Sequence, residues 1–379
     1  MHVRGYAAPE TRASLDQASS LIKQVEALGE PLEDPLVLFS VLYGLWVASY
    51  NAFDGDRVLE RATQCLAAAE EQGTTIPLMV AHRVMGISLG HTGDLTEGRV
   101  HFDRARGLFD PAKHRSLATR FGQDIGVSIL FQRSLPLWML GYPDAALADC
   151  CEAMINAREI GQAATIMATL LYTSIVQILC GNETAANAQA DELAVLASDK
   201  GSALWKSFGV LLKGTVLALT GRSSEAGETL ISGISALRSA GSTLWMPFWS
   251  SHLAKSCADL GQFADAWRYM REAIMVIEIS KEKLFEAEVN RMAGEIALLA
   301  PEPDAGKAEA HFVRALDVAR EQQAKSWELR AATSLATLQR NRGQHDNARE
   351  LLAPVCGWFR EGFDTLDLKR AKALLDEIS

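Results

Sequence analysis

The sequence predicts an all-α solenoid of about eight helical hairpins, each of roughly 40 residues, followed by a C-terminal capping helix. A turn with glycine five residues ahead of a small residue recurs at Gly93/Gly98, Gly141/Ala146, Gly181/Ala186, Gly221/Ala226, Gly261/Ala266 and Gly343/Ala348. With Val58 and Ala308 at the small position of degenerate copies, the steps are 40, 48, 40, 40, 40, 42 and 40 residues. No copy shows the alternation of a β-strand.

Each repeat has the features of a helical hairpin. The turn glycine supplies the left-handed conformation that ends a first helix, and the small residue lets a second helix pack closely against it. In "GQFADAWRYMREAI", apolar residues recur every three or four positions and form one stripe. That stripe consists of Phe263, Ala266, Tyr269, Met270 and Ala273. One hairpin cannot cover such a stripe, so neighbouring hairpins must stack.

Composition excludes several classes of protein. The chain has 379 residues, 48% of them hydrophobic, and a formal net charge of −10 without a run of lysine and arginine, so nucleic acid is not an expected partner. Its six cysteines form no C-x-x-C pair, so neither a zinc site nor a disulfide framework is predicted. The first residues lack the apolar region of a signal peptide. These features favour a cytoplasmic protein.

Two uncharged stretches, residues 35–53 and 160–182, are long enough to span a membrane. The second contains Gln162, Gln177 and several threonines and serines, and both coincide with the more buried helix of a repeat. We therefore interpret both as buried helices and predict no membrane partner.

Large aromatic residues begin four successive first helices at steps of 40, 40 and 42 residues. They are Trp205, Trp245, Phe285 and Trp327, in "ALWKSF", "TLWMPF", "KLFEAE" and "KSWELR". Packing between adjacent repeats is the favoured role, and a ligand-lining ladder on the concave face is the alternative. Arg330, in the last of these segments, is also a candidate ligand contact.

The segment "HRSLATRFGQDIGV", residues 114–127, lies in the one interval of 48 residues. Asp110 and Pro111 end the preceding helix, and we expect one long helix from about His114 to Leu140. The segment either forms an internal polar network that joins two repeats or contacts a peptide, a small ligand or a sister domain. Its candidate contacts are His114, Arg115, Arg120, Gln123 and Asp124.

The two ends of the chain differ. We expect a single solenoid over 1–379, with an uncapped helix in 1–30, repeats over 35–360 and a cap over 361–379. In the first helix Leu15, Ala18, Ile22 and Val25 form an apolar stripe with no preceding helix to cover it. We expect this stripe to dock on another domain, a separate polypeptide or a second copy. In the cap, Asp364 or Thr365 begins a helix whose apolar face covers the open end.

Enzyme motifs are absent from the sequence. It contains no G-x-x-x-x-G-K-[ST] loop, no H-E-x-x-H and no G-x-S-x-G. Histidines 82, 91, 101, 252, 311 and 345 fall on separate helices or turns, where surface or capping roles are the expectation. We predict no catalytic residue, no cofactor and no metal.

The C-terminal stretch "QQAKSWELRAATSLATLQRNRGQHDNARELLAPVCGWFREGFDTLDLKRAKALLDE" resembles the end of a family of large bacterial signalling proteins. In that family a class III adenylate/guanylate cyclase domain precedes an AAA/STAND-type ATPase and then a long TPR-like region. The segments "RGYAAPE", "HRSLATRFGQDIGV" and "LWMPFW" are similar to other landmarks of that region, and Cys356 stands where tyrosine is expected. The resemblance covers essentially the whole chain and implies a right-handed TPR-like superhelix without the cyclase and ATPase domains.

These observations predict a non-catalytic interaction or regulatory arm that binds a protein or peptide, such as a cyclase/ATPase module. One alternative is a protein assigned to cyclase signalling by its family. Another is a small-ligand sensor with a closed apolar pocket beside Trp205 and Trp245.

Overall fold

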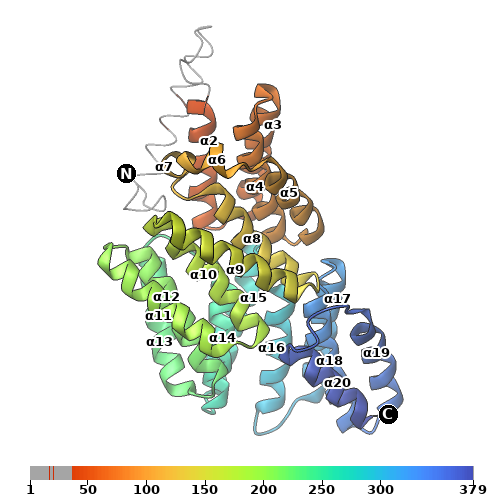
Figure 1. Ribbon diagram of the computed structural model, residues 1–379. Helices are drawn as coiled ribbons and strands as arrows, with labels where there is room; N and C mark the ends of the chain where they lie inside the picture. Colours follow the sequence, from red (N-terminus) through yellow and green to blue (C-terminus); the bar gives the residue numbers. More distant parts are fainter. Residues whose placement is uncertain (1–16, 18–19, 21–35, 379) are drawn as a thin grey trace.

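The computed structural model describes residues 17, 20 and 36–378, and every regular element among them is helical. Eight hairpins follow one another, and a final helix closes the series (Figure 1). The hairpins are α2 (Leu36–Asn51) with α3 (Gly55–Gln72), α4 (Thr75–Thr92) with α5 (Leu95–Leu108), α8 (Ile125–Met139) with α9 (Pro143–Ile160), α10 (Ala163–Cys180) with α11 (Glu183–Asp199), α12 (Ala203–Leu219) with α13 (Ser223–Ser239), α14 (Met246–Asp259) with α15 (Phe263–Ser280), α16 (Glu286–Leu299) with α17 (Ala305–Glu321), and α18 (Lys325–Asn341) with α19 (His345–Trp358). The last helix is α20 (Leu366–Glu377). The predicted all-α, TPR-like solenoid is confirmed.

The recurring turn has the predicted geometry. Gly181 ends α10 at φ 80°, and its N–H donates to the carbonyl of Gln177. Five residues later Ala186 is fully buried where α11 packs against α10. A larger side chain at Ala186 would separate the two helices, so the small residue fixes the hairpin.

The two helices of a hairpin are buried to different degrees. First helices lie between neighbours and are buried on almost every side, as in α8. Second helices bury one stripe, which in α15 consists of Ala266, Met270, Ala273 and Ile277. The helix α10 is long and apolar enough to cross a membrane, but 78% of that window is buried inside the protein. Burial in the core therefore accounts for the apolar composition of α10.

Successive turns of the superhelix touch. Three of these contacts join the end of a first helix to the start of the first helix five hairpins further along the chain. The Thr243 N–H donates to the Asn51 carbonyl (2.9 Å), and the Lys283 N–H donates to the His91 carbonyl (2.8 Å). Ser326 Oγ donates to the Trp138 carbonyl. These bonds join α2 to the start of α14, α4 to α16, and α8 to α18, so the solenoid is wound tightly on itself.

The prediction of a single long helix beginning at His114 is wrong. The segment forms α6 (Pro111–His114), a 3-10 turn at Arg115–Leu117 and α7 (Ala118–Phe121) before α8 begins. Gly122 has φ 78° and ends α7, while Asp124 Oδ1 accepts from the Val127 N–H (2.9 Å) and caps α8. A left-handed glycine followed by a capping aspartate ends one helix and begins another. The extra residues therefore add a bent connection rather than two helical turns.

The C-terminal helix covers the last hairpin as expected. Thr365, rather than Asp364, is the residue before α20, and Leu368, Ala371 and Leu374 are buried against the core. The predicted N-terminal helix and its stripe lie outside the described residues.

Candidate binding chamber

The four aromatic residues of the repeat register do not share one environment. Trp245, Phe285 and Trp327 are fully buried, and the ring of Phe285 lies 6.1 Å from Trp245 and 6.3 Å from Trp327. Trp205 is only half-buried, with Phe208 of the same helix as a ring neighbour. Three of the four therefore form a continuous packed core along the starts of α14, α16 and α18.

Trp245 is the centre of a buried polar junction between the two superhelical turns. Its indole N–H donates to His91 Nε2 (3.0 Å), and its backbone N–H donates to a carboxyl oxygen of Glu282 (2.8 Å). Tyr50 hydroxyl lies 3.0 Å from the same histidine nitrogen and 2.6 Å from the hydroxyl of Tyr172. We call these five residues the junction. It fills the interior where α2, α4 and α10 meet the start of α14.

The junction also holds its histidine uncharged. Trp245 Nε1 can only donate, so His91 Nε2 must accept, and Nδ1 carries the proton toward the carbonyl of Ile87 (2.9 Å). Burial lowers the pKa of His91 to about 4. Burial also raises the pKa of Glu282 to about 8, against the hydrogen bond from Trp245. The junction is thus built from neutral rings and one carboxyl that resists ionisation.

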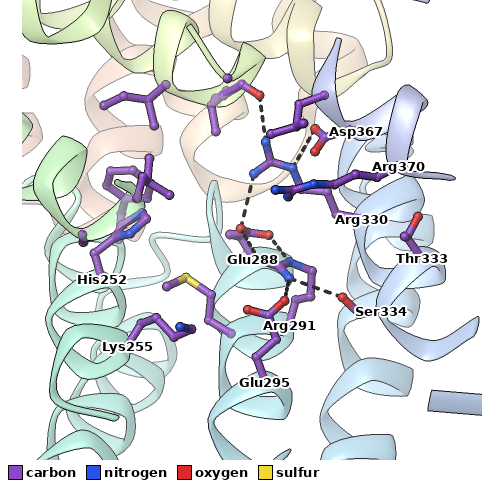
Figure 2. Close-up of a pocket in the computed structure, with 18 of the residues that line it drawn as sticks. His252, Lys255, Glu288, Arg291, Glu295, Arg330, Thr333, Ser334, Asp367 and Arg370 are labelled. Carbon is purple, nitrogen blue, oxygen red and sulfur yellow. Dashed lines mark hydrogen bonds and ion pairs between the residues drawn. The ribbon is translucent and has the colours of Figure 1, made fainter. Parts of the chain in front are cut away.

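Beyond the junction the interior is open. A chamber of about 470 Å³ lies between α10, α12, α14, α16, α18 and α20 (Figure 2). Its polar lining residues are Glu183, His252, Lys255, Glu288, Arg291, Glu295, Arg330, Thr333, Ser334, Thr337, Asp367 and Arg370. The volume is that of an ordinary ligand pocket, but such pockets are mostly apolar, and this one carries charged groups on several helices.

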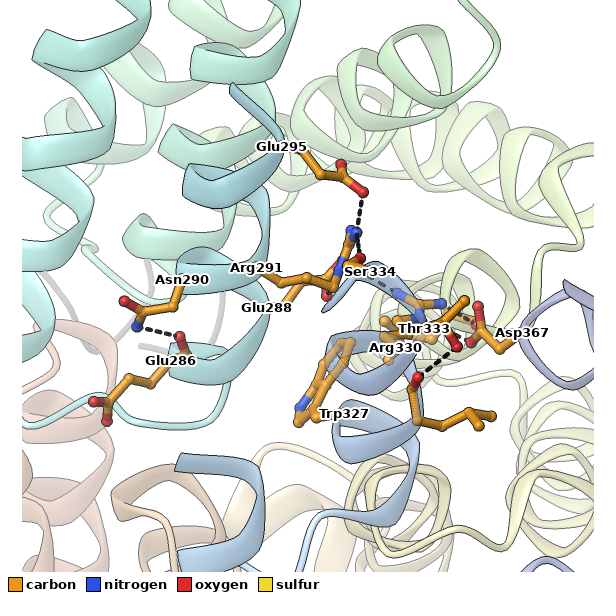
Figure 3. Close-up of polar contacts among 12 residues, drawn as sticks. Glu286, Glu288, Asn290, Arg291, Glu295, Trp327, Arg330, Thr333, Ser334 and Asp367 are labelled. Atoms are coloured by element: carbon orange, nitrogen blue, oxygen red, sulfur yellow. Dashed lines mark hydrogen bonds and ion pairs between the residues drawn. The ribbon is translucent and has the colours of Figure 1, made fainter. Parts of the chain in front are cut away.

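A network of ion pairs forms one wall of the chamber (Figure 3). Arg291 donates twice to Glu288, with both N–O distances 2.8 Å, and also donates to Glu295 and Ser334. Arg330 bonds the same glutamate from the next repeat (3.3 Å). Glu288 accepts hydrogen bonds from Arg291 of its own helix, α16, and from Arg330 of α18, so it links two repeats along the chamber wall.

Arg330 also reaches the opposite wall. Its Nε donates to Asp367 of α20 (2.8 Å), and its remaining terminal nitrogen donates to the Leu179 carbonyl at the end of α10 (2.7 Å). The guanidinium carbon lies 5.0 Å and 5.2 Å from the ring centroids of Trp138 and Trp327. These contacts orient the guanidinium on every side, which a lysine at this position could not reproduce.

Electrostatics keep the wall charged although it is buried. Burial by itself would raise the pKa of Glu288, but Arg291 and Arg330 outweigh burial and lower that pKa to about 2. Burial would lower the pKa of Arg291, and its two glutamate partners hold it well above its usual value. Because the wall is buried in a region of low dielectric constant, its fixed charges interact strongly with polar groups that enter the chamber.

Three polar chamber residues, Glu183, His252 and Arg370, have no hydrogen-bond or ion-pair partner in the part of the chain that the structure describes. The ring of His252 is 5% exposed and packs on Phe248 (4.6 Å between centroids), and no hydrogen bond reaches its nitrogens. Burial lowers its pKa to about 4, so the imidazole is neutral at pH 7. Arg370 is exposed on α20 and has no ion pair. The imidazole and this guanidinium both have free capacity for a ligand.

Of the candidate ligand contacts predicted from the sequence, Arg330 alone lines the chamber. The structure buries His114, whose Nδ1 accepts from the Asp110 N–H (3.0 Å), and Arg120 donates to Ser40. Asp124 and Arg115 line a separate, smaller pocket. Gln123 lies beside Asp124 in the connection before α8. None of the four register aromatics lines the chamber, so the closed apolar pocket expected beside Trp205 and Trp245 is not found in this space.

The expectation for the histidines is wrong at three positions, because His91, His101 and His252 are buried. His82 and His101, on neighbouring helices, lie 3.0 Å apart at their Nδ1 atoms. Among the described residues no group of three or more histidine, cysteine or acidic side chains could hold a metal ion.

The aromatic register contained a signal that would have located the chamber. The positions three and ten residues after each aromatic face the interior along one side of the first helix. From Phe285 and Trp327 these positions are Glu288, Glu295, Arg330 and Thr337, and all four line the chamber. Three residues after the aromatic, the two preceding repeats carry Phe208 and Phe248 instead, while Lys255, ten residues after Trp245, already lines the chamber. A change from apolar to charged residues at one repeat position therefore marks the open part of the interior.

The fold and the chamber define the class as a helical-repeat solenoid with a polar interior. No protein-family model and no curated protein matches the chain. Solved structures, however, are similar to the chain. A Rap protein complexed with competence and sporulation factor is similar over 100% of this chain and 96% of its own, with a TM-score of 0.66 and 10% identity. The Rap conjugation gene regulator of plasmid pLS20, in complex with the Phr* peptide, is similar over 95% and 89%, with a TM-score of 0.54 and 12% identity.

At these identities the likeness concerns the fold alone. A STAND protein with a tetratricopeptide repeat sensor from Pyrococcus horikoshii is also similar, but its TM-score of 0.44 is too low to argue from. The two Rap structures thus share the fold of this chain, and the link to cyclase proteins stays a prediction.

Proposed function

We propose that this chain is a non-catalytic regulatory protein whose chamber binds a peptide. The observation that carries the proposal is the wall of oriented ion pairs formed by Glu288, Arg291, Arg330 and Asp367 around an open space. The two similar Rap structures, which contain a competence and sporulation factor and a Phr* peptide, have the same fold and support this choice.

The chemistry of the chamber fits a peptide better than an apolar small molecule. A peptide offers backbone donors and acceptors at regular intervals together with charged termini or side chains. The chamber offers the neutral His252 ring, the free Arg370 guanidinium and the hydroxyls of Thr333, Ser334 and Thr337. Ion pairs that are already formed need little reorganisation when a ligand enters, which reduces the cost of binding.

The experiment is an affinity selection of random linear peptides, five to seven residues long, on the full chain. We expect selected sequences to bind the wild type and to lose at least about tenfold in affinity with Arg370→Ala or His252→Ala, because each removes a free polar contact. Calorimetry measures the loss.

Arg271→Ala is the matched control, since Arg271 is an exposed arginine of α15 and does not line the chamber. Selected peptides should bind this variant as they bind the wild type. Equal binding to all three variants, or no enrichment at all, would reject the chamber as a peptide site.

We further propose that peptide binding acts on a cyclase/ATPase module, as the family resemblance implies, in the cytoplasm. Occupancy of the chamber should then change nucleotide turnover by the polypeptide that carries those domains. The assay adds a selected peptide to that polypeptide together with this chain, and unchanged turnover would remove the cyclase link while leaving the peptide site intact.

A further inference from the structure

A second pocket lies at the irregular segment of the sequence, away from the chamber. It has a volume of about 110 Å³ between α5, α6, α8 and α9, and none of its lining residues also lines the chamber. Its apolar lining is formed by Phe109, Pro111, Val127, Ile129, Leu130 and Ile160. Residues of the long interval, Phe109, Pro111, Arg115 and Asp124 among them, therefore form part of its wall.

Gly126 and Phe109 shape this pocket. Gly126 is in the first turn of α8, and a Cβ there would collide with the ring of Phe109. Without that Cβ, the ring can lie directly against the α8 backbone and serve as a wall. The glycine that the sequence places beside Asp124 thus keeps an aromatic surface next to a carboxyl group.

Asp124 is the buried polar group in the lining. It is 1% exposed; its Oδ1 accepts from the Val127 N–H and its own N–H donates to Thr165 Oγ1 (2.9 Å). Its Oδ2 is buried, with no hydrogen-bond partner in the described part of the chain. Burial raises the pKa of Asp124, against the pull of the Val127 N–H, of Arg115 and of the Gly126 N–H. A buried carboxyl oxygen without a partner is costly, and a ligand that donates to it removes the cost.

Two arginines at the rim, Arg106 and Arg115, pair with acidic residues and so do not exclude a positively charged ligand. Arg106 lies 3.1 Å from Glu152 and 3.5 Å from Asp149, and Arg115 lies 3.9 Å from Glu159. Both arginines therefore have acidic partners of their own, whereas Asp124 Oδ2 has no hydrogen-bond partner among the described residues. An anion would meet the Asp124 carboxylate at the buried side of the pocket, whereas a cation would complete a charge-assisted hydrogen bond there.

We propose that this pocket binds a small amine: a compact, branched apolar body with a protonated nitrogen on Asp124 Oδ2. The body packs between Phe109 and Ile160, where the volume accommodates about five heavy atoms. The pocket is thus a second ligand site whose chemistry differs from that of the chamber, and it does not depend on peptide binding.

Three probes of the same shape test the charge preference: isobutylamine, isobutanol and isobutyrate. Each is titrated into the full chain with labelled isoleucine and leucine methyl groups, observed by NMR. We expect saturating shifts at Ile129, Leu130 and Ile160 with isobutylamine, with a millimolar Kd because so few atoms are involved. Isobutanol should bind roughly tenfold more weakly, and isobutyrate should not saturate.

Asp124→Asn keeps the helix-capping oxygen and removes the charge, so we expect the amine to lose its advantage over the alcohol. Asp304→Asn is the matched control, because Asp304 caps α17 in the same way and lies outside the pocket. Equal shifts with all three probes, or an amine preference that survives in Asp124→Asn, would overturn the proposal. If Asp124→Asn does not fold, the probe comparison on the wild type decides by itself.

Discussion

The junction and the chamber occupy the same interior of one superhelix, yet one is filled and the other open. In the junction, Tyr50, Tyr172 and Trp245 place large rings between the turns, and these rings hydrogen-bond to one another or to His91. In the chamber, arginines and glutamates pair with one another along the wall instead of filling the space (Figure 2). Whether large rings or paired charges line the interior therefore decides where this solenoid keeps a cavity.

The two regions also contribute differently to stability. Buried aromatic area stabilises a fold directly, whereas a buried ion pair roughly breaks even once desolvation is counted. Removing a ring from the junction should therefore cost most. Removing one charged side chain from the chamber wall should lower stability because its partner is then a buried charge without a counterion.

The largest effect is expected for Trp245→Ala. The ring is fully buried and contacts residues of both turns, so its loss should lower the free energy of unfolding by about 4 kcal/mol. Urea denaturation followed by circular dichroism measures this. Trp267→Ala is the control, since Trp267 is only partly buried on α15. A loss below that of the control would mean that the turns are not held together at the junction.

The next effect is expected for Glu288→Ala, which leaves Arg291 and Arg330 without their shared acceptor. We expect a loss of about 3 kcal/mol at pH 7. The pKa of Glu288 is lowered to about 2, so its contribution is present above its unfolded value near 4.5 and disappears as pH falls toward 2. The difference in stability between wild type and variant should therefore shrink in acid. A constant difference from pH 7 to pH 3 would contradict the charge-based account.

Sequence reasoning located the repeats and missed the chamber for a physical reason. Hairpin packing depends on residues close in sequence, such as Gly261 and Ala266, and their spacing is readable. The chamber depends on which distant helices meet when the superhelix closes, as when Arg330 meets Leu179 and Asp367. The break after Phe121 departs from the predicted long helix because Gly122 ends one helix and Asp124 caps the next.

Glu282→Gln tests the junction with a substitution that should raise stability rather than lower it. The pKa of Glu282 is raised to about 8, so its effect on stability is most favourable below its unfolded value near 4.5 and is lost as pH rises through 8. Glutamine keeps an acceptor for the Trp245 N–H and cannot ionise. We expect the variant to be more stable than wild type by on the order of 2 kcal/mol at pH 8.5, and nearly equal at pH 5. Thermal melts at the two pH values measure this, and equal stability at pH 8.5 would show that the carboxyl is not held in a buried, unpaired state.

The smallest effect is expected for Trp205→Ala, although Trp205 holds the same repeat position as Trp245. Trp205 is half-buried and has a ring neighbour on its own helix, whereas Trp245 bonds His91 on the facing turn. The register therefore fixes where an aromatic lies in its hairpin, and the superhelix decides how much of it is buried. We expect a loss of about 1 kcal/mol in urea denaturation, because partial burial removes less apolar area from water. A loss as large as that of Trp245→Ala would show that contacts within the hairpin, rather than contacts between turns, set the stability of this position.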